Sequence, residues 1–290
     1  MMITLPAAID SAISDALVLL ESRLVCASHE ATTHQVVWVG GWGADANTIH
    51  AVGAYLVGLR VAAVQQSLTI RAAIKNTPED RAEVVTSVEA IVGASNAALT
   101  QDQKEDERNP WLAEGLWHLC LMLASRRKEL HPGGEVVALD FPHVAAKDHG
   151  LDVVAIYRSN GAFGLSLVES KAYAQDPNKA ISDAVAFFRD VDAGIHDTRI
   201  RQVVAGMRSA LPKDLQDAIS PSLWKAHRTY IPNPHYDISV AKDWSNARPS
   251  LNGLKAPVHI MPHQVDTFAT FFDNVADAMR SFAASLPSHV

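Results

Sequence analysis

The sequence has only two cysteines among its 290 residues, Cys26 and Cys120, and they have no CxxC spacing. This scarcity excludes a disulfide-stapled scaffold and a zinc ribbon, since both need several closely spaced cysteines. Cys120 lies in an apolar, helix-like stretch, where a buried, reduced thiol is expected. The glycines of residues 40–43 are not followed by Gly-Lys-Ser/Thr, and no dinucleotide fingerprint occurs. They predict a turn rather than a phosphate-binding loop.

Long apolar runs are also missing. The most apolar stretch, residues 116–124, is too short to cross a bilayer and contains His118. Residues 9–24 interleave acidic side chains with apolar ones, which predicts an amphipathic helix rather than a secretory signal. We therefore expect a cytoplasmic protein without membrane contact. An apolar fraction of 48% and a charged fraction of 20% are typical of a folded globular chain.

Positive charge is scarce overall, because the formal net charge is −7. This negative net charge argues against a protein that binds nucleic acid through overall electrostatic attraction, because contacts with phosphates require clustered Lys and Arg. The distribution is uneven, however: residues 195–260 hold nine Lys and Arg against five Asp, so 9 − 5 = +4 there and −11 elsewhere. That asymmetry is compatible with a nucleic-acid face on the C-terminal side, and an ordinary solvated surface explains it almost as well.

The N-terminal part of the chain is predicted to be mostly helical. Apolar spacing indicates helices over residues 9–24 and 47–73, and Thr77-Pro78 predicts the start of another that reaches about residue 98. A polar connector at residues 101–108 is taken as the boundary between a region 1–108 and a domain 109–290.

From residue 109 onward the pattern is that of an α/β domain with a mixed sheet. Asn109-Pro110 predicts the start of a helix to about residue 130, and strands are expected at 136–141, 151–158 and 163–173. Short connections favour antiparallel pairing of these three strands. Further helices are expected from Asp176-Pro177, over 199–219 and over 265–284, with extended pieces at 227–231 and 257–261.

Three charged residues in two of these strands carry the functional prediction. Side chains alternate along a strand, so Glu169 and Lys171 face one side while Ser170 faces away. Asp152 begins the preceding strand. If the two strands form a hairpin through residues 159–161, Asp152 lies beside Glu169.

Two carboxylates at close range repel unless a hard cation lies between them. We therefore predict a Mg²⁺ site, with Mn²⁺ as a possible substitute, whose candidate ligands are Asp152, Glu169, Ser170 and Glu114. Lys171 would orient a water or stabilise charge that develops on a phosphate. Glu114 lies at helical spacing from apolar side chains, so it needs a partner, either a metal or a structural bond to a neighbouring backbone group.

These residues resemble the PD-(D/E)xK nuclease superfamily. The match consists of Asp152 and Glu169-Ser170-Lys171 on successive strands, with Glu114 as the acid of the first core helix, and it covers roughly residues 109–232. More narrowly, Gly150-Leu151-Asp152 and residues 168–173 resemble the HamA effectors of Hachiman anti-phage systems. The resemblance implies a restriction-endonuclease-like core, catalytic roles for Asp152, Glu169, Lys171 and Glu114, a DNA substrate and a helicase partner. No proline precedes Asp152, and the first hundred residues match no motif.

Other interpretations remain open at this point. A Glu-x-Lys triplet alone carries little weight, because one is expected in a chain of this size by composition. The same fold could also serve a non-catalytic regulatory subunit that binds nucleic acid or a protein. His259 and His263 are four residues apart, but Pro262 lies between them, so a helical zinc motif is not expected.

Overall fold

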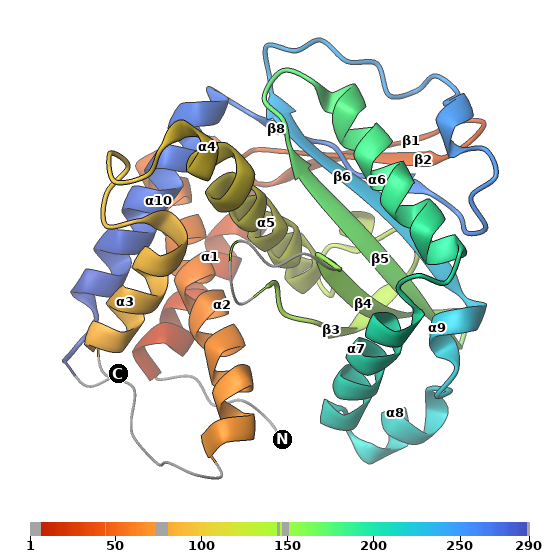
Figure 1. The fold of residues 1–290 in the computed structure, drawn as a ribbon, viewed down its shortest axis with the longest axis horizontal. Helices are drawn as coiled ribbons and strands as arrows, with labels where there is room; N and C mark the ends of the chain where they lie inside the picture. The colour runs from red at the N-terminus through yellow and green to blue at the C-terminus, as the bar shows by residue number, and fades with distance from the viewer. Residues whose placement is uncertain (1–6, 44, 73–80, 144–145, 147–150, 289–290) are drawn as a thin grey trace.

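The computed structural model describes residues 7–43, 45–72, 81–143, 146 and 151–288 (Figure 1). The longer helices are α1 (Ala7–Arg23), α2 (Ala46–Ala72), α3 (Arg81–Val92), α5 (Asn109–Leu123), α6 (Pro177–Asp192), α7 (Asp197–Ala210) and α10 (Phe268–Ser285). The strands are β1 (Val25–Glu30), β2 (Gln35–Gly40), β3 (Glu135–Leu139), β4 (Val153–Ser159), β5 (Ala162–Ala172), β6 (Arg228–Asp237), β7 (His259–Ile260) and β8 (His263–Val265). Short helical pieces are α4 (Gln101–Gln103), the π-helical turn η1 (Lys104–Arg108), η2 (Lys128–Leu130), α8 (Lys213–Ala218), α9 (Leu223–Ala226) and η3 (Pro249–Leu251).

The strands form one mixed sheet in the order β1-β2-β8-β6-β5-β4-β3, with β7 beside β2. Pairing is antiparallel at both ends of the sheet, for β1 with β2 and for β3, β4 and β5, and parallel in the centre. The predicted α/β class and the antiparallel pairing of the first three strands of the C-terminal part are therefore confirmed.

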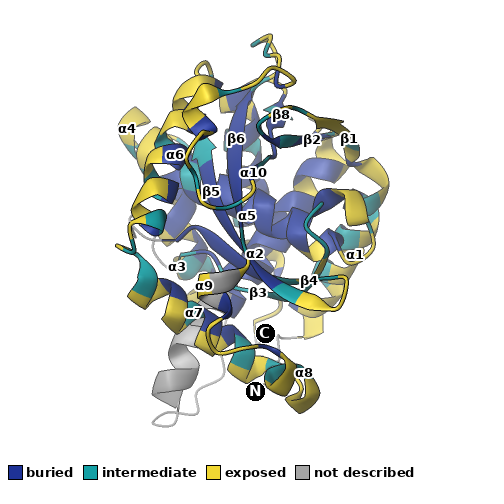
Figure 2. Cartoon of the chain, turned by 90° about the vertical axis from the view of Figure 1, so that its right-hand side faces the viewer, coloured by how far each residue is buried: buried dark blue, intermediate teal, exposed yellow. Residues whose placement is uncertain are grey.

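Helices cover both faces of this sheet, as the alternation of apolar side chains requires. Val153 and Ala155 of β4 pack in a cluster with α1, α2, α3, α5 and α10, whereas Val154 and Ile156 pack in a second cluster with α6 and α7. The centre of the sheet is buried between these two layers (Figure 2). Because each central strand is buried on both sides, a charged residue in it needs a compensating partner.

The β4–β5 hairpin has the predicted turn. Asn160 and Gly161 both have positive φ, 50° and 80°, and Asn-Gly is the pair best suited to such a two-residue connection. The register runs from Ser159 paired with Ala162 to Val153 paired with Val168. A tight turn thus fixes which residues of the two strands lie opposite each other at the far end.

The prediction of a polar connector at residues 101–108 is wrong, because this segment is helical. Thr100 and Gln103 form a reciprocal capping box, which starts a helix that continues through η1 into α5. Asn109 is therefore inside a helix and not an N-cap. The π-helical turn ends at Arg108, two residues before Pro110, and its wider coil accommodates a ring that has no N–H to donate.

Other element boundaries also differ from the prediction. The helix α5 ends at Leu123 rather than near residue 130, and α3 ends at Val92, before Gly93, whose φ is +71°. The expected helix over 199–219 is divided into α7 and α8, because Pro212 interrupts it. Strands β1 and β8 were not expected. The predicted start at Thr77-Pro78 and the end of the second helix at residue 73 lie outside the described residues.

The boundary after Arg108 stays a prediction. Residues on both sides of it share one hydrophobic cluster, in which α10 packs with α2 and α3 (Figure 1). None of the helices in the described part of the chain has the length and apolar character needed to span a bilayer.

Two buried histidines make the folded state sensitive to acid. Burial lowers the pKa of both His118 and His235 from the ordinary 6.5 to about 3. Between these values the unfolded chain binds protons that the folded protein excludes, so the free energy of unfolding decreases as the pH falls below about 6.5. Each histidine contributes a slope of up to about 1.4 kcal/mol per pH unit.

Replacing His235 with Leu is expected to flatten this pH dependence. The ring of His235 lies 4.4 Å from that of His263, which is also buried and disfavours a second positive charge. Urea unfolding between pH 7.5 and 5 checks the expectation: the free energy of unfolding of the variant, relative to that of wild type, should rise towards low pH. Parallel curves would contradict it, and the exposed His29→Leu serves as the control.

Candidate functional site

The β4–β5 hairpin brings the predicted strand residues together. Because Val153 pairs with Val168, the preceding Asp152 lies next to Glu169. Asp152 is buried, and its Oδ2 accepts a hydrogen bond of 2.7 Å from the backbone N–H of Ser170. The hydroxyl of Ser170 instead donates to Asn233 on β6, over 2.9 Å. Ser170 thus fixes Asp152 through its amide, while its hydroxyl is engaged elsewhere.

Glu169 and Lys171 share one side of β5, as predicted. Their Oε1 and Nζ atoms are 2.6 Å apart. The Glu169 carboxylate is buried, whereas the Lys171 side chain is 27% exposed. The second oxygen of Glu169, Oε2, is buried and has no hydrogen-bond partner among the described residues. An oxygen in this state still has the capacity to accept a proton donor or a cation.

Glu114 enters the same site from α5. It is buried, as its apolar neighbours predicted, and His143 is its partner: Nδ1 of His143 lies 3.3 Å from Oε2 of Glu114. His143 belongs to the segment after β3, and its carbonyl accepts a 2.8 Å hydrogen bond from the indole N–H of Trp111 on α5. One helix therefore supplies the acid and also anchors the histidine.

His143 was not recognised in the sequence. Its only signal is its place just beyond a strand end, after Pro142, and no spacing motif connects it to the other residues. In the structure, ligand atoms of Glu114, His143 and Asp152 all lie within 4.8 Å of one another. Glu169 lies outside this close group, although it neighbours Asp152.

Burial dominates the electrostatics of the site. Burial, together with repulsion from Glu114, raises the pKa of Asp152 to about 7, and burial, together with repulsion from Asp152, raises that of Glu169 to about 8. Burial also raises the pKa of Glu114. For Lys171, burial disfavours the charged form, but the carboxylates of Glu169 and Asp152 outweigh it and raise the pKa. Lys171 therefore keeps its positive charge, whereas burial disfavours the charged forms of the three carboxylates.

A divalent cation fits this arrangement. When Glu114, Asp152 and Glu169 are ionised, their three negative charges and the one positive charge of Lys171 leave −3 + 1 = −2, which one such ion balances. The raised carboxylate pKa values describe the cost of holding these charges without the ion. Glu114, His143 and Asp152 are the residues placed closely enough to hold it.

The site opens into a cleft of about 1110 Å³, between α5, β5, α6 and the start of α7. All the predicted residues, Glu114, Asp152, Glu169, Ser170 and Lys171, contribute to its lining. Farther out, the lining includes the acidic Glu105, Asp106, Glu107 and Asp190 and the basic Arg199. Among the described residues the mouth is therefore mostly acidic, which opposes unaided entry of a polyanion.

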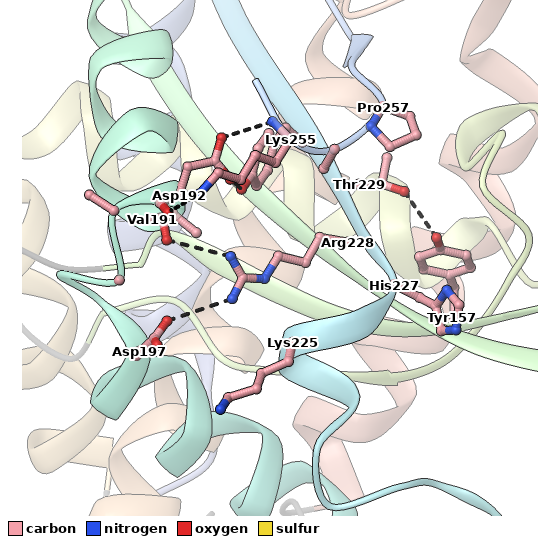
Figure 3. A pocket seen from close by; sticks show the side chains of 14 residues that line it. Tyr157, Val191, Asp192, Asp197, Lys225, His227, Arg228, Thr229, Lys255 and Pro257 are labelled. Atoms are coloured by element: carbon pink, nitrogen blue, oxygen red, sulfur yellow. Dashed lines mark hydrogen bonds and ion pairs between the residues drawn. The ribbon is translucent and has the colours of Figure 1, made fainter. Parts of the chain in front are cut away.

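A second cavity, of about 640 Å³, lies at the opposite end of β6, and its lining includes three of the nine basic residues of the segment 195–260, Lys225, Arg228 and Lys255 (Figure 3). Two of these cations have partners in the fold: Arg228 lies 3.6 Å from the Asp197 carboxylate, and the Lys255 ammonium donates to the backbone carbonyl of Asp192 over 2.8 Å. The backbone N–H of Lys255 donates to the Asp192 carboxylate over 2.9 Å. Tyr230 also donates to Asp192. These contacts identify a structural network that joins α6 to β6, so the regional surplus of +4 does not by itself mark an anion site.

No protein-family model matches the chain, and no curated protein matches it. Function is therefore inferred from the geometry of the cleft.

Proposed function

We propose that this chain is a metal-dependent nuclease that hydrolyses DNA phosphodiester bonds, built on a PD-(D/E)xK-type core. The observation that carries the proposal is the convergence of Asp152, Glu169 and Lys171 at one end of the β4–β5 hairpin, with Glu114 reaching them from α5. A buried net charge of this size is expensive for a purely structural cluster.

Asp152, Glu114 and His143 would hold the ion. When bound, a divalent ion such as Mg²⁺ or Mn²⁺ polarises a phosphate oxygen and increases the acidity of a nearby water.

Lys171 would stabilise the negative charge that develops on the phosphate as the bond breaks. Its ammonium is partly exposed to the cleft, and its short contact with Glu169 fixes its position. A preorganised charge inside a poorly hydrated site stabilises a transition state more than a mobile surface charge does. Glu169 thus acts at least partly as a positioning residue for Lys171.

The acidic mouth supports a second element of the proposal, a protein partner that delivers the DNA. Glu105, Asp106 and Glu107 all lie on the π-helical turn η1, beside the cleft. Since they repel phosphates, the positive charge for DNA engagement would come from the partner. The resemblance to anti-phage effectors suggests a helicase in this role.

The same acidic mouth also favours an alternative, a non-catalytic subunit that binds a protein on a nuclease-like fold. Such a subunit would keep its partner when Lys171 is replaced, and it would show no metal-dependent cleavage in any combination of proteins. The two proposals thus give opposite results in one assay.

Replacing Lys171 with Ala is expected to reduce cleavage by about 100-fold or more, because it removes the charge that stabilises the transition state. The measurement is degradation of DNA in Mg²⁺ or Mn²⁺, by the chain alone and with a candidate helicase partner, with chelator to stop the reaction. The matched control is Lys213→Ala, since Lys213 forms an exposed ion pair with Asp217 far along the chain.

Wild-type activity in the Lys171 variant would remove the central residue from the proposal. Metal-independent cleavage would equally contradict it. Circular dichroism and partner binding should remain unchanged in both lysine variants, which separates lost chemistry from lost folding.

A further inference from the structure

The close group of Glu114, His143 and Asp152 mixes nitrogen and oxygen ligands. We infer that this group binds a first-row transition-metal ion such as Mn²⁺ in preference to Mg²⁺, with His143 as a direct nitrogen ligand. The inference rests on the proposed metal-dependent function, and it concerns the kind of ion that the site selects.

The three residues come from separate elements that meet at one point. Glu114 lies on α5, His143 follows β3 and Asp152 directly precedes β4. Their ligand atoms lie within 4.8 Å of one another, a spacing that one ion can bridge with small adjustments. Asp152 and Glu114 supply two negative charges, which suffice to neutralise a divalent cation.

The imidazole of His143 is a fixed part of the site. Its side chain is 8% exposed, and Nδ1 is directed at Glu114 over 3.3 Å. The Trp111 indole holds the backbone of His143 through the 2.8 Å hydrogen bond to its carbonyl. Because this anchor and Glu114 belong to the same helix, the histidine keeps its place relative to the acid.

Ligand chemistry decides which ion suits such a group. Mg²⁺ is a hard ion that takes oxygen ligands in a nearly ideal octahedron and retains several waters. Imidazole nitrogen favours first-row transition ions, and a given site generally binds them in the order Mn²⁺ < Fe²⁺ < Co²⁺ < Ni²⁺. A histidine among the three closest ligands thus shifts the balance away from Mg²⁺.

A buried His–Glu contact could also be purely structural, as many ion pairs are. In that case the imidazole would stay on Glu114 and an ion would bind through oxygen alone. The two arrangements differ in one observable property, a nitrogen bonded to the ion.

Electron spin-echo measurements on the Mn²⁺-loaded full chain test this directly, because a coordinated imidazole produces ¹⁴N modulation. We expect the modulation in wild type and in His196→Gln, a control at the same cleft. We expect it to disappear in His143→Gln and in His143→Asp. Calorimetric Kd values for Mn²⁺ and Mg²⁺ should show the preference for Mn²⁺ falling by about tenfold or more in His143→Asp, whose added carboxylate suits Mg²⁺.

Because both His143→Gln and His143→Asp are measured, the loss of the nitrogen ligand can still be tested if one of these variants folds poorly. Absence of ¹⁴N modulation in wild type, or an unchanged Mn²⁺/Mg²⁺ ratio in His143→Asp, would overturn the inference. If metal-dependent cleavage and its loss in Lys171→Ala persisted, the proposed nuclease function would stand without it. Conversely, ¹⁴N modulation in a chain that cleaves no DNA, either alone or with a candidate helicase partner, would support this metal site and overturn the nuclease proposal.

Discussion

Replacing Asp152 with Asn is expected to lower metal-dependent cleavage by about 1000-fold or more and to stabilise the metal-free protein at pH 8. The first effect follows because the amide removes a charge from the centre of the ligand group. The second follows from burial: with a pKa of about 7, Asp152 is mostly ionised at pH 8 inside an apolar surrounding and beside Glu114. Asn has the same shape but no charge, so it removes both the cost of burying the carboxylate and its repulsion from Glu114.

The expected gain in the free energy of unfolding is on the order of 1–3 kcal/mol. Asn can still accept the hydrogen bond from the backbone N–H of Ser170, which limits any local loss. Chemical denaturation in the presence of chelator measures the gain. Addition of Mn²⁺ should then raise the melting temperature of wild type but leave the variant unchanged, because a ligand stabilises only the form that binds it.

Asp217→Asn is the matched control, since Asp217 forms an exposed pair with Lys213. It should leave cleavage, stability and the response to Mn²⁺ as in wild type. Opposite signs for activity and stability are the signature of a residue retained for function at a cost to folding. Wild-type cleavage by the Asp152 variant would contradict the assignment, and so would a loss of stability without metal.

The relative positions of Asp152, Glu169 and Lys171 could be predicted because they follow from local rules. Alternation along a strand places Glu169 and Lys171 on one side, and the Asn160-Gly161 turn sets the register that brings Asp152 beside them. These rules involve residues close in sequence, so no knowledge of the remaining chain was needed.

His143 could not be predicted in the same way, because its role depends on tertiary contacts. It meets Glu114 only after α5 has packed against the sheet, and Trp111 holds it there. Strands β1 and β8 were missed for a related reason. The outer strand β1 is mostly exposed and lacks a buried stripe, and β8 is three residues long and is ordered by its parallel neighbours.

Replacing Arg108 with Met is expected to lower the free energy of unfolding by about 2–4 kcal/mol, one of the largest effects of a substitution outside the cleft. The Arg108 side chain is 1% exposed. Its NH1 group donates to Asp273 on α10 over 2.6 Å and to Asn96 over 3.2 Å, while Nε and NH2 both donate to Asn109. The guanidinium thus joins the start of α5 to the last helix of the chain.

Methionine fills a similar volume but donates no hydrogen bond. Among the described residues, the Asn109 side-chain oxygen then loses its donor, and the Asp273 carboxylate keeps Lys104, at 3.3 Å, as its cationic partner. Arg108→Lys retains the charge without the planar guanidinium and should lower the free energy of unfolding by about half as much.

Arg126→Met is the surface control: its ion pair with Glu21 involves a side chain that is 51% exposed, so the expected change is below about 1 kcal/mol. Urea unfolding of the three variants should rank them Arg108→Met, Arg108→Lys and Arg126→Met in decreasing loss of stability. Because α5 also carries Glu114, equal stability of Arg108→Met and wild type would show that packing alone fixes this helix and the acid that it presents to the site.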